Sequence, residues 1–270
     1  MVPAETPQWL LAVWSRAVVE AGSPAPAAEI ERMGAKVLER WANPSRHFHG
    51  MNHLIMVLEK IDELSQEASC PCLVRLAAFY HGAILSGGAG ASAVNAWSED
   101  HSLSADLAEG QLRHLELPAA KATRVRQLIA DLGARPPLIK DPDLAVLCDA
   151  ERAILAADPR TYRCYARDVR AECADAPLPE VLRARIAVLR AWLAKDRLFH
   201  TSGTAAWEQA ARNNVEAELA RSARELAGAE TPPALTNTWL VHRPFVSAPP
   251  TADAGRNLAS SGSHSAIPQH

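Results

Sequence analysis

Hydrophobic residues return every three or four positions along most of this chain, which is the spacing of one face of an α helix. Pro, Gly, Ser and Asn separate the periodic segments, as expected for connections between helices. The pattern predicts an all-α protein of about ten helices. The predicted helices are 6–22, 30–41, 45–63, 73–85, 98–112, 118–132, 141–155, 158–172, 179–193 and 204–226.

The periodic pattern stops near the C-terminal end of the chain. Residues 229–270 are rich in Pro, Ser, Thr and Gly and show no helical or alternating repeat over any long stretch. Such a segment buries too little apolar surface to offset the entropy of ordering it. We therefore predict one helical domain over residues 1–228, followed by a disordered tail over residues 229–270.

The composition and charge of the chain indicate which partners and which cellular location to expect. The chain is 48% hydrophobic and 22% charged, which is ordinary for a globular protein. Its formal net charge of −3 provides no basic field for a nucleic acid. No run of eighteen apolar residues is present, so no membrane partner is expected. The five cysteines are an odd number in a chain with ample core, which favours reduced thiols and a cytoplasmic location.

Three histidines stand out in two neighbouring apolar segments. His49 and His53 are four residues apart, so on one helix they would share a face with about 6 Å between Cβ atoms. His81 closes the next apolar segment. A lone buried histidine is usually a core residue satisfied by a hydrogen bond, whereas several together favour a metal or proton-transfer site. The residues alone leave both interpretations open.

Two carboxylates interrupt a later buried pattern. Asp149 and Glu151 lie in a segment from 141 to 155 whose other residues are mostly apolar. A buried carboxylate is costly unless it is paired or bound to a cation. Glu151 therefore either pairs with a residue such as Arg152 or serves, like Asp149, as a candidate ligand.

These segments resemble the motifs of the HD superfamily of metal-dependent phosphohydrolases. In one bacterial branch the first motif is Arg-His-Tyr-His-x-x-x-His, to which residues 46–53 correspond, and the second is Ala-Ala-Trp-Phe-His-Asp, to which residues 77–82 correspond. The acidic motif corresponds to 147–152, and the resemblance covers roughly residues 5 to 225. It implies an HD-domain helical bundle. Further matching positions are Tyr165, Arg170, Glu172 and residues 214–219.

The resemblance also implies roles for individual residues. By similarity to cyclic-nucleotide phosphodiesterases, His49 would be the general acid and His53 a metal ligand, with His81 as a second ligand. The final acidic ligand would be Glu151 or Asp149. The implied cofactor is a divalent metal ion, Mn, Fe, Zn or Mg. The implied partner is a small phosphorylated molecule, either a phosphoester or a nucleotide.

The chain departs from the family pattern at several positions. Gly82 stands where the family has the Asp that bridges two metals, so we expect one ion rather than two. The family's Asn-Glu-Glu segment is replaced by Asp100-His101-Ser102, and its Thr-x-x-His falls in 131–134, where no histidine stands. An alternative function is therefore a catalytically inactive HD scaffold that binds a ligand or a protein, with Gly82 opening space where the metal was.

Overall fold

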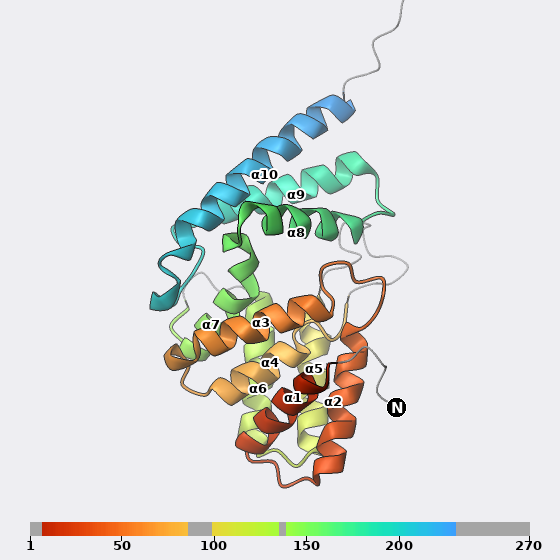
Figure 1. Cartoon of the computed structure of the whole chain (residues 1–270), viewed down its shortest axis with the longest axis vertical. Helices are drawn as coiled ribbons and strands as arrows, with labels where there is room; N and C mark the ends of the chain where they lie inside the picture. Colours follow the sequence, from red (N-terminus) through yellow and green to blue (C-terminus); the bar gives the residue numbers. More distant parts are fainter. Residues whose placement is uncertain (1–6, 86–98, 135–138, 231–270) are drawn as a thin grey trace, which may run out of the picture. The chain divides into compact units, whose positions relative to one another are not determined.

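A computed structural model describes residues 7–85, 99–134 and 139–230 of the chain (Figure 1). The all-α prediction is confirmed, because the regular elements of the described residues are ten α helices and three short 3₁₀ helices. The only β pairing in these ranges is a single bridge between Leu85 and Glu99. The elements are α1 (Gln8–Glu20), α2 (Ala27–Trp41), α3 (Met51–Glu63), η1 (Ser65–Glu67), α4 (Pro71–Tyr80), α5 (His101–His114), α6 (Ala119–Ala134), α7 (Pro142–Arg152), η2 (Ala153–Ala156), α8 (Pro159–Ala171), α9 (Leu178–Leu193), η3 (Ser202–Thr204) and α10 (Trp207–Glu230).

Several helices begin at the signals that the sequence contains. The side chains of Asp100, Asp141 and Asp158 accept hydrogen bonds from backbone N–H groups in the first turns of α5, α7 and α8. An aspartate at this position satisfies donors that have no partner within the helix. Proline follows Asp141 and Asp158 at the first helical position, where its missing N–H costs nothing.

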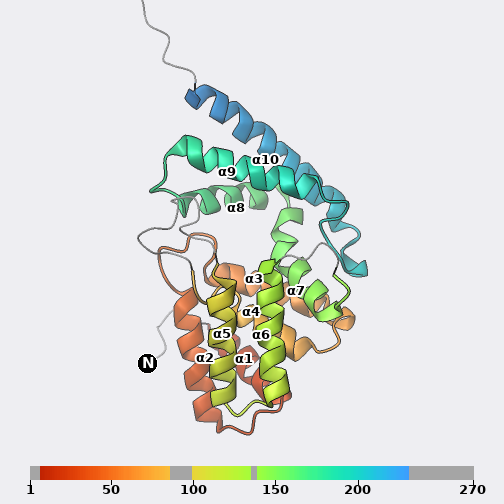
Figure 2. The ribbon, with the colours of Figure 1, turned by 180° about the vertical axis from the view of Figure 1, so that it is seen from behind.

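The first hydrophobic core lies among α1 to α7, with α4 at its centre (Figures 1 and 2). Trp14 and Trp41 are fully buried, and their indole N–H groups donate to the carbonyls of Ile30 and Phe79. The Trp14 ring meets the edge of Phe79, with 5.4 Å between ring centroids. Both tryptophans therefore contact Phe79 in the last turn of α4, two residues before His81.

The second hydrophobic core lies among η2, α8, α9 and α10 (Figure 2). The Tyr162 hydroxyl donates to Glu218, and the Glu218 carboxylate also accepts from Arg185. The Asn214 side chain donates to the carbonyls of Leu155 and Ala157, which ties α10 to the segment that follows α7. The side chains of Tyr162, Glu218 and Asn214 therefore each have hydrogen-bond partners in this core.

The predicted start of the third helix is wrong. Helix α3 begins at Met51 with Gly50 as its N-cap, so His49 lies in the preceding loop rather than one helical turn before His53. The backbone N–H groups of Phe48 and His49 donate to Glu172 instead of entering a helix. A tertiary contact thus overrides the local periodicity.

The ends of α4 and α10 also differ from the predicted boundaries, by fewer residues. Helix α4 ends at Tyr80, which leaves His81 at the C-cap, and α10 extends to Glu230, beyond the boundary at 228. The rest of the predicted tail, 231–270, lies outside the described residues, as does the glycine-rich stretch 86–96. Within the described ranges, every helix is too short or too polar to cross a membrane.

Candidate metal centre

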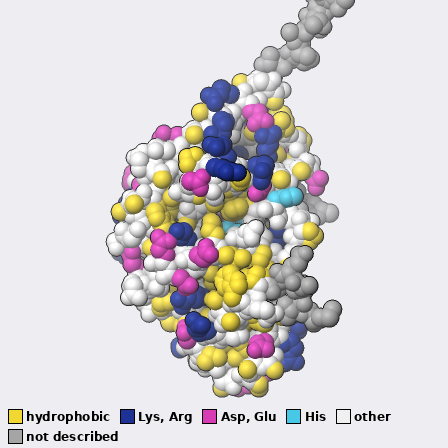
Figure 3. Space-filling model, in the orientation of Figure 1, with side chains coloured by type: hydrophobic (Ala, Val, Ile, Leu, Met, Phe, Trp, Pro, Cys, Tyr) yellow, Lys and Arg dark blue, Asp and Glu magenta, His cyan; other side chains and the backbone are white. Residues whose placement is uncertain are grey.

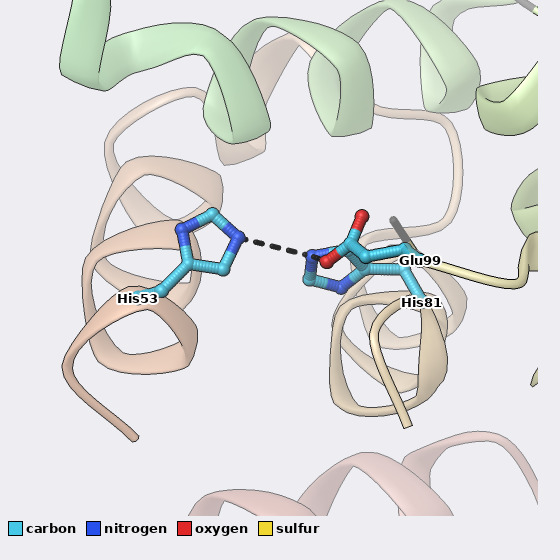
Figure 4. Close-up of side chains that lie close together, drawn as sticks. All are labelled: His53, His81 and Glu99. Carbon is cyan, nitrogen blue, oxygen red and sulfur yellow. Dashed lines mark hydrogen bonds and ion pairs between the residues drawn. The ribbon is translucent and has the colours of Figure 1, made fainter. Parts of the chain in front are cut away.

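His53 and His81 face each other in the first core. His53 lies on the buried face of α3 with Val57 and Ile61, and His81 follows the last turn of α4. Both residues are at most 2% exposed, and their Nε2 atoms are 3.2 Å apart (Figure 4). Two nitrogens bound to one tetrahedral zinc-like ion would be about 3.3 Å apart. The pair therefore has the spacing that a shared cation requires.

Hydrogen bonding fixes which nitrogen of His81 can bind. Its Nδ1 is 2.7 Å from the carbonyl oxygen of Ala78, so Nδ1 donates to that carbonyl and Nε2 is the atom that faces His53. Metal-binding histidines are commonly oriented in this way. Burial, together with the nearby His81 and His49, lowers the pKa of His53 well below its usual value. The neutral form of His53 is therefore favoured, and a cation bound between the two Nε2 atoms would take the place of the hydrogen bond that joins them.

Glu99 brings a carboxylate to the two imidazoles. Its Oε1 is 3.5 Å from Nε2 of His81, its Oε2 is 3.3 Å from Nε2 of His101, and its side chain is 7% exposed (Figure 4). One ligand atom each from His53, His81 and Glu99 lie within 4.8 Å of one another. Burial raises the pKa of Glu99, but His81 and His101 lower it more, and the net pKa is well below the usual value.

The Glu99 carboxylate and His53 both keep an unsatisfied buried atom. Oε1 of Glu99 and Nδ1 of His53 have no hydrogen-bond partner among the described residues. A buried carboxylate oxygen without a partner is costly. A cation bound by Oε1 and the two Nε2 atoms would remove that cost for Glu99, so the residues present fit a divalent ion.

Sequence reasoning missed Glu99 as a candidate ligand. The predicted helix 98–112 places Glu99 in its first turn, where an acidic residue interacts favourably with the helix dipole. In the structure Asp100 caps α5 by accepting from Leu103, so Glu99 stands outside the helix and pairs with Leu85. The sequence does contain a signal for this boundary. Asp100 lies three residues before Leu103, the first apolar residue of α5, as expected for an N-cap.

The structure places Asp149 and Glu151 apart from the group formed by His53, His81 and Glu99. Asp149 is fully buried, and its carboxylate accepts from the backbone N–H groups of His200 and Thr201 and from the Thr201 hydroxyl. The side chain of Glu151 is 27% exposed and lies 4.0 Å from Arg152, at the limit of an ion pair. Of the four predicted ligands, the structure brings together His53 and His81.

His49 is held beside this group by Glu172. Its Nδ1 lies 2.7 Å from Oε2 of Glu172, and its ring centroid is 5.6 Å from that of His53. Burial lowers the pKa of His49, but the hydrogen bond to Glu172 and the charges of Glu99, Glu172 and Glu151 raise it more, so the net pKa is raised. Because Nδ1 donates to Glu172, Nε2 is the ring atom available to give a proton to another group.

Arg46 connects the His49 loop to the segment after His81. Its guanidinium donates to the carbonyls of His49 and Gly82, at 3.1 and 2.6 Å, and lies over the Trp41 ring. These contacts explain why an arginine precedes the histidines. The side chain positions backbone on both sides of the site.

Gly82 lets Glu99 and Trp41 approach the end of α4. A Cβ atom at position 82 would lie 2.5 Å from Oε1 of Glu99 and 2.7 Å from Cη2 of Trp41. Real Cβ atoms do not come so close to other heavy atoms. The space beside Gly82 is therefore filled by the Trp41 ring and the Glu99 carboxylate rather than left open.

We expect Gly82→Asp to weaken cation binding, although it restores the residue of the family motif. The new side chain must displace Trp41 or Glu99, and overpacking of this kind costs roughly 1 to 3 kcal/mol of unfolding free energy. Urea unfolding and a metal titration measure the two effects. Gly82→Ala is the matched control, because it adds the Cβ atom without a charge. Tighter metal binding by Gly82→Asp would show that Glu99 is not a ligand.

We expect Glu172→Gln to lower the pKa of His49. The amide oxygen can still accept from Phe48 and His49, but the negative charge that favours the imidazolium is lost. A raised pKa keeps His49 protonated below that pKa, and the proton is lost as the pH rises through it. The descending limb of any rate that needs this proton should therefore move to lower pH in the variant. NMR titration of the His49 ring measures the pKa directly, and an unchanged pKa would contradict the role of Glu172.

The chain was compared with protein-family models, with curated proteins and with solved structures, and none of them matches it. The geometry of His53, His81, Glu99 and His49 therefore provides the basis for assigning a function.

Proposed function

We propose that this chain is a metal-dependent phosphohydrolase of the HD type that acts on a small phosphoester or nucleotide through one divalent ion. The supporting observation is the convergence of His53, His81 and Glu99 from three separate segments, with a buried Glu99 oxygen, Oε1, that has no hydrogen-bond partner among the described residues. In this proposal Glu99 supplies the carboxylate that the family takes from the position of Gly82. Two nitrogen ligands and one oxygen ligand favour Zn, Mn or Fe over Mg, which prefers oxygen ligands throughout.

Each residue of the site has a distinct task in the proposed reaction. The ion, when bound, polarises a phosphoryl oxygen and lowers the pKa of a bound water molecule. His53, His81 and Glu99 hold it, and the Ala78 carbonyl orients His81. His49 donates the Nε2 proton to the leaving oxygen, a role that its raised pKa suits near neutral pH.

Glu172 and Arg46 keep the proton donor in place. Glu172 accepts from Nδ1 of His49 and from the backbone around it, which sets the direction of the ring. Arg46 binds the carbonyls of His49 and Gly82 and so limits the distance between the His49 loop and the end of α4. A positioned acid of this type contributes about 10²- to 10⁴-fold to a hydrolysis rate.

The proposal is tested by measuring metal content and hydrolysis on the same preparation of the full chain. We expect close to one Zn, Mn or Fe per chain after metal-replete growth, and loss of that metal in His53→Ala. His114→Ala is the matched control, because His114 is largely exposed and its side chain pairs with Glu29. Hydrolysis of aryl phosphate esters and nucleotides should stop with a chelator and return with the metal.

The outcomes separate the proposal from the inactive-scaffold alternative. Stoichiometric metal that is lost in His53→Ala, together with chelator-sensitive hydrolysis, supports the enzyme. Stoichiometric metal without hydrolysis of any phosphoester supports the scaffold. A chain that remains metal-free in replete medium contradicts the metal centre itself.

A further inference from the structure

A half-open cavity of about 600 Å³ lies beside the second core, between α8, α9 and α10. Its lining residues recur at helical spacing, so one face of each helix turns toward it: Arg163, Arg167 and Arg170 on α8, Val181, Arg185 and Val188 on α9, and Glu218, Arg221 and Glu225 on α10. The volume suits a small organic molecule. None of the residues of the candidate metal centre lines this cavity.

Positive charge exceeds negative charge around the cavity. Five arginines line it against two carboxylates, in a chain whose formal charge is −3. Figure 3 shows Lys and Arg side chains gathered on this part of the molecule, with hydrophobic atoms between them. Such a local excess favours an anionic ligand.

The arginines divide into paired and available groups. Arg185 is held by Glu218 at 2.7 Å, and Arg170 by Glu225 at 2.8 Å. Arg167 pairs with its neighbour Asp168 at 2.8 Å. Arg163 and Arg221 form no hydrogen bond or ion pair with any other described residue, although they line the same cavity from α8 and α10. These two guanidinium groups can turn to a ligand without breaking an existing pair.

Most of the remaining lining is aliphatic, and Cys173 and Ser222 complete it. Small and branched side chains cover the surface between the charges, and Val188 is 38% exposed. No aromatic ring of a described residue lines the cavity, so a nucleobase would find no stacking partner. The aliphatic lining residues are Ala166, Val169, Val181, Leu182, Ala184 and Val188.

Arg185 gives the cavity a preformed wall. Its guanidinium lies 5.2 Å from the ring centroids of both Tyr165 and Trp192, and its Nε is bound by Glu218. A side chain fixed in this way loses little freedom when a ligand binds. The cavity is therefore shaped before any ligand arrives.

We propose that this cavity binds a small anion with an aliphatic body, whose phosphate or carboxylate head pairs with Arg163 and Arg221. A guanidinium group can form two parallel hydrogen bonds to either head group. The aliphatic body covers Val181, Leu182 and Val188, which removes apolar surface from water. This binding does not depend on the metal centre.

Calorimetry on the full chain with octyl phosphate, kept below its micelle-forming concentration, tests the proposal. We expect octyl phosphate to bind at least about tenfold more tightly than inorganic phosphate, which lacks the chain, or octyl glucoside, which lacks the charge. Octanoate should bind as well, since its head group has the same recognition chemistry. Failure of octyl phosphate and octanoate to bind would overturn the proposal and leave the metal centre untouched.

Substitutions locate the binding. We expect Arg163→Ala and Arg221→Ala each to weaken octyl phosphate binding about five- to tenfold. Arg224→Ala is the matched control, because Arg224 is exposed on α10 outside the lining. Ala184→Trp should fill the cavity and abolish binding, with its fold checked by circular dichroism. Equal binding by the two arginine variants and the control would place the ligand elsewhere and overturn the assignment.

Discussion

Replacement of Glu99 by alanine is expected to weaken binding of a divalent cation at least about a hundredfold, since loss of residues that merely orient ligands already costs 10- to 100-fold. Oε1 of Glu99 is the only carboxylate oxygen that the described residues place with the two imidazole nitrogens. Without it, the candidate site has two imidazole nitrogens and no carboxylate to hold a doubly charged ion. A competition titration against a chelating dye measures the affinity.

Glu151→Ala is the matched control for this prediction. Glu151 is acidic and partly buried like Glu99, but it does not belong to the described group of ligand atoms. Its replacement should leave the affinity within about twofold of the original. Metal retained in Glu99→Ala but lost in Glu151→Ala would favour the ligand that the motif resemblance implies and would contradict the assignment of Glu99.

Replacement of Asp149 by alanine is expected to lower the free energy of unfolding by about 3 to 5 kcal/mol. The Asp149 carboxylate accepts from the backbone N–H groups of His200 and Thr201 and from the Thr201 hydroxyl, at 2.7 to 2.9 Å. Alanine leaves those donors without their acceptor in a buried place. Urea unfolding followed by circular dichroism measures the change.

Two further variants show whether Asp149 has a structural role. Glu151→Ala changes a carboxylate on the same helix that makes one contact at 4.0 Å, and it should cost well under about 1 kcal/mol. Thr201→Val removes one of the donors and should cost an intermediate amount. If Asp149→Ala unfolds like the original chain but releases metal, then Asp149 is a ligand and its hydrogen bonds carry little stability.

The helices were largely predictable because their signals are local. An aspartate-proline pair marks the start of α7 and of α8, and the apolar repeat of α2 ends at Trp41 as predicted. The predicted start of α3 is wrong because Glu172, more than a hundred residues away in the sequence, binds the backbone N–H groups of the first predicted turn. The residues around position 45, where the helix was predicted to begin, do not indicate this contact.

The candidate site was predictable only in part, for a related reason. His53 and His81 could be found because a histidine on an apolar face is visible in the sequence. Glu99 reaches them because the ends of two chain segments meet at the Leu85 bridge, which is a tertiary event. Asp149 was predicted as a candidate ligand, but backbone N–H groups of His200 and Thr201 bind its carboxylate. The sequence does not identify such partners, because every residue except proline has a backbone N–H group.

The contact between Glu172 and His49 joins the two hydrophobic cores at the proposed reaction centre. The cation ligands come from the first core, while the carboxylate that orients the proton donor comes from the end of α8 in the second. Loosening of the second core would therefore release the acid without releasing the metal. If the proposed function is correct, such a chain would keep its metal content but hydrolyse its substrate slowly, so metal content and rate would depend on different cores of the protein.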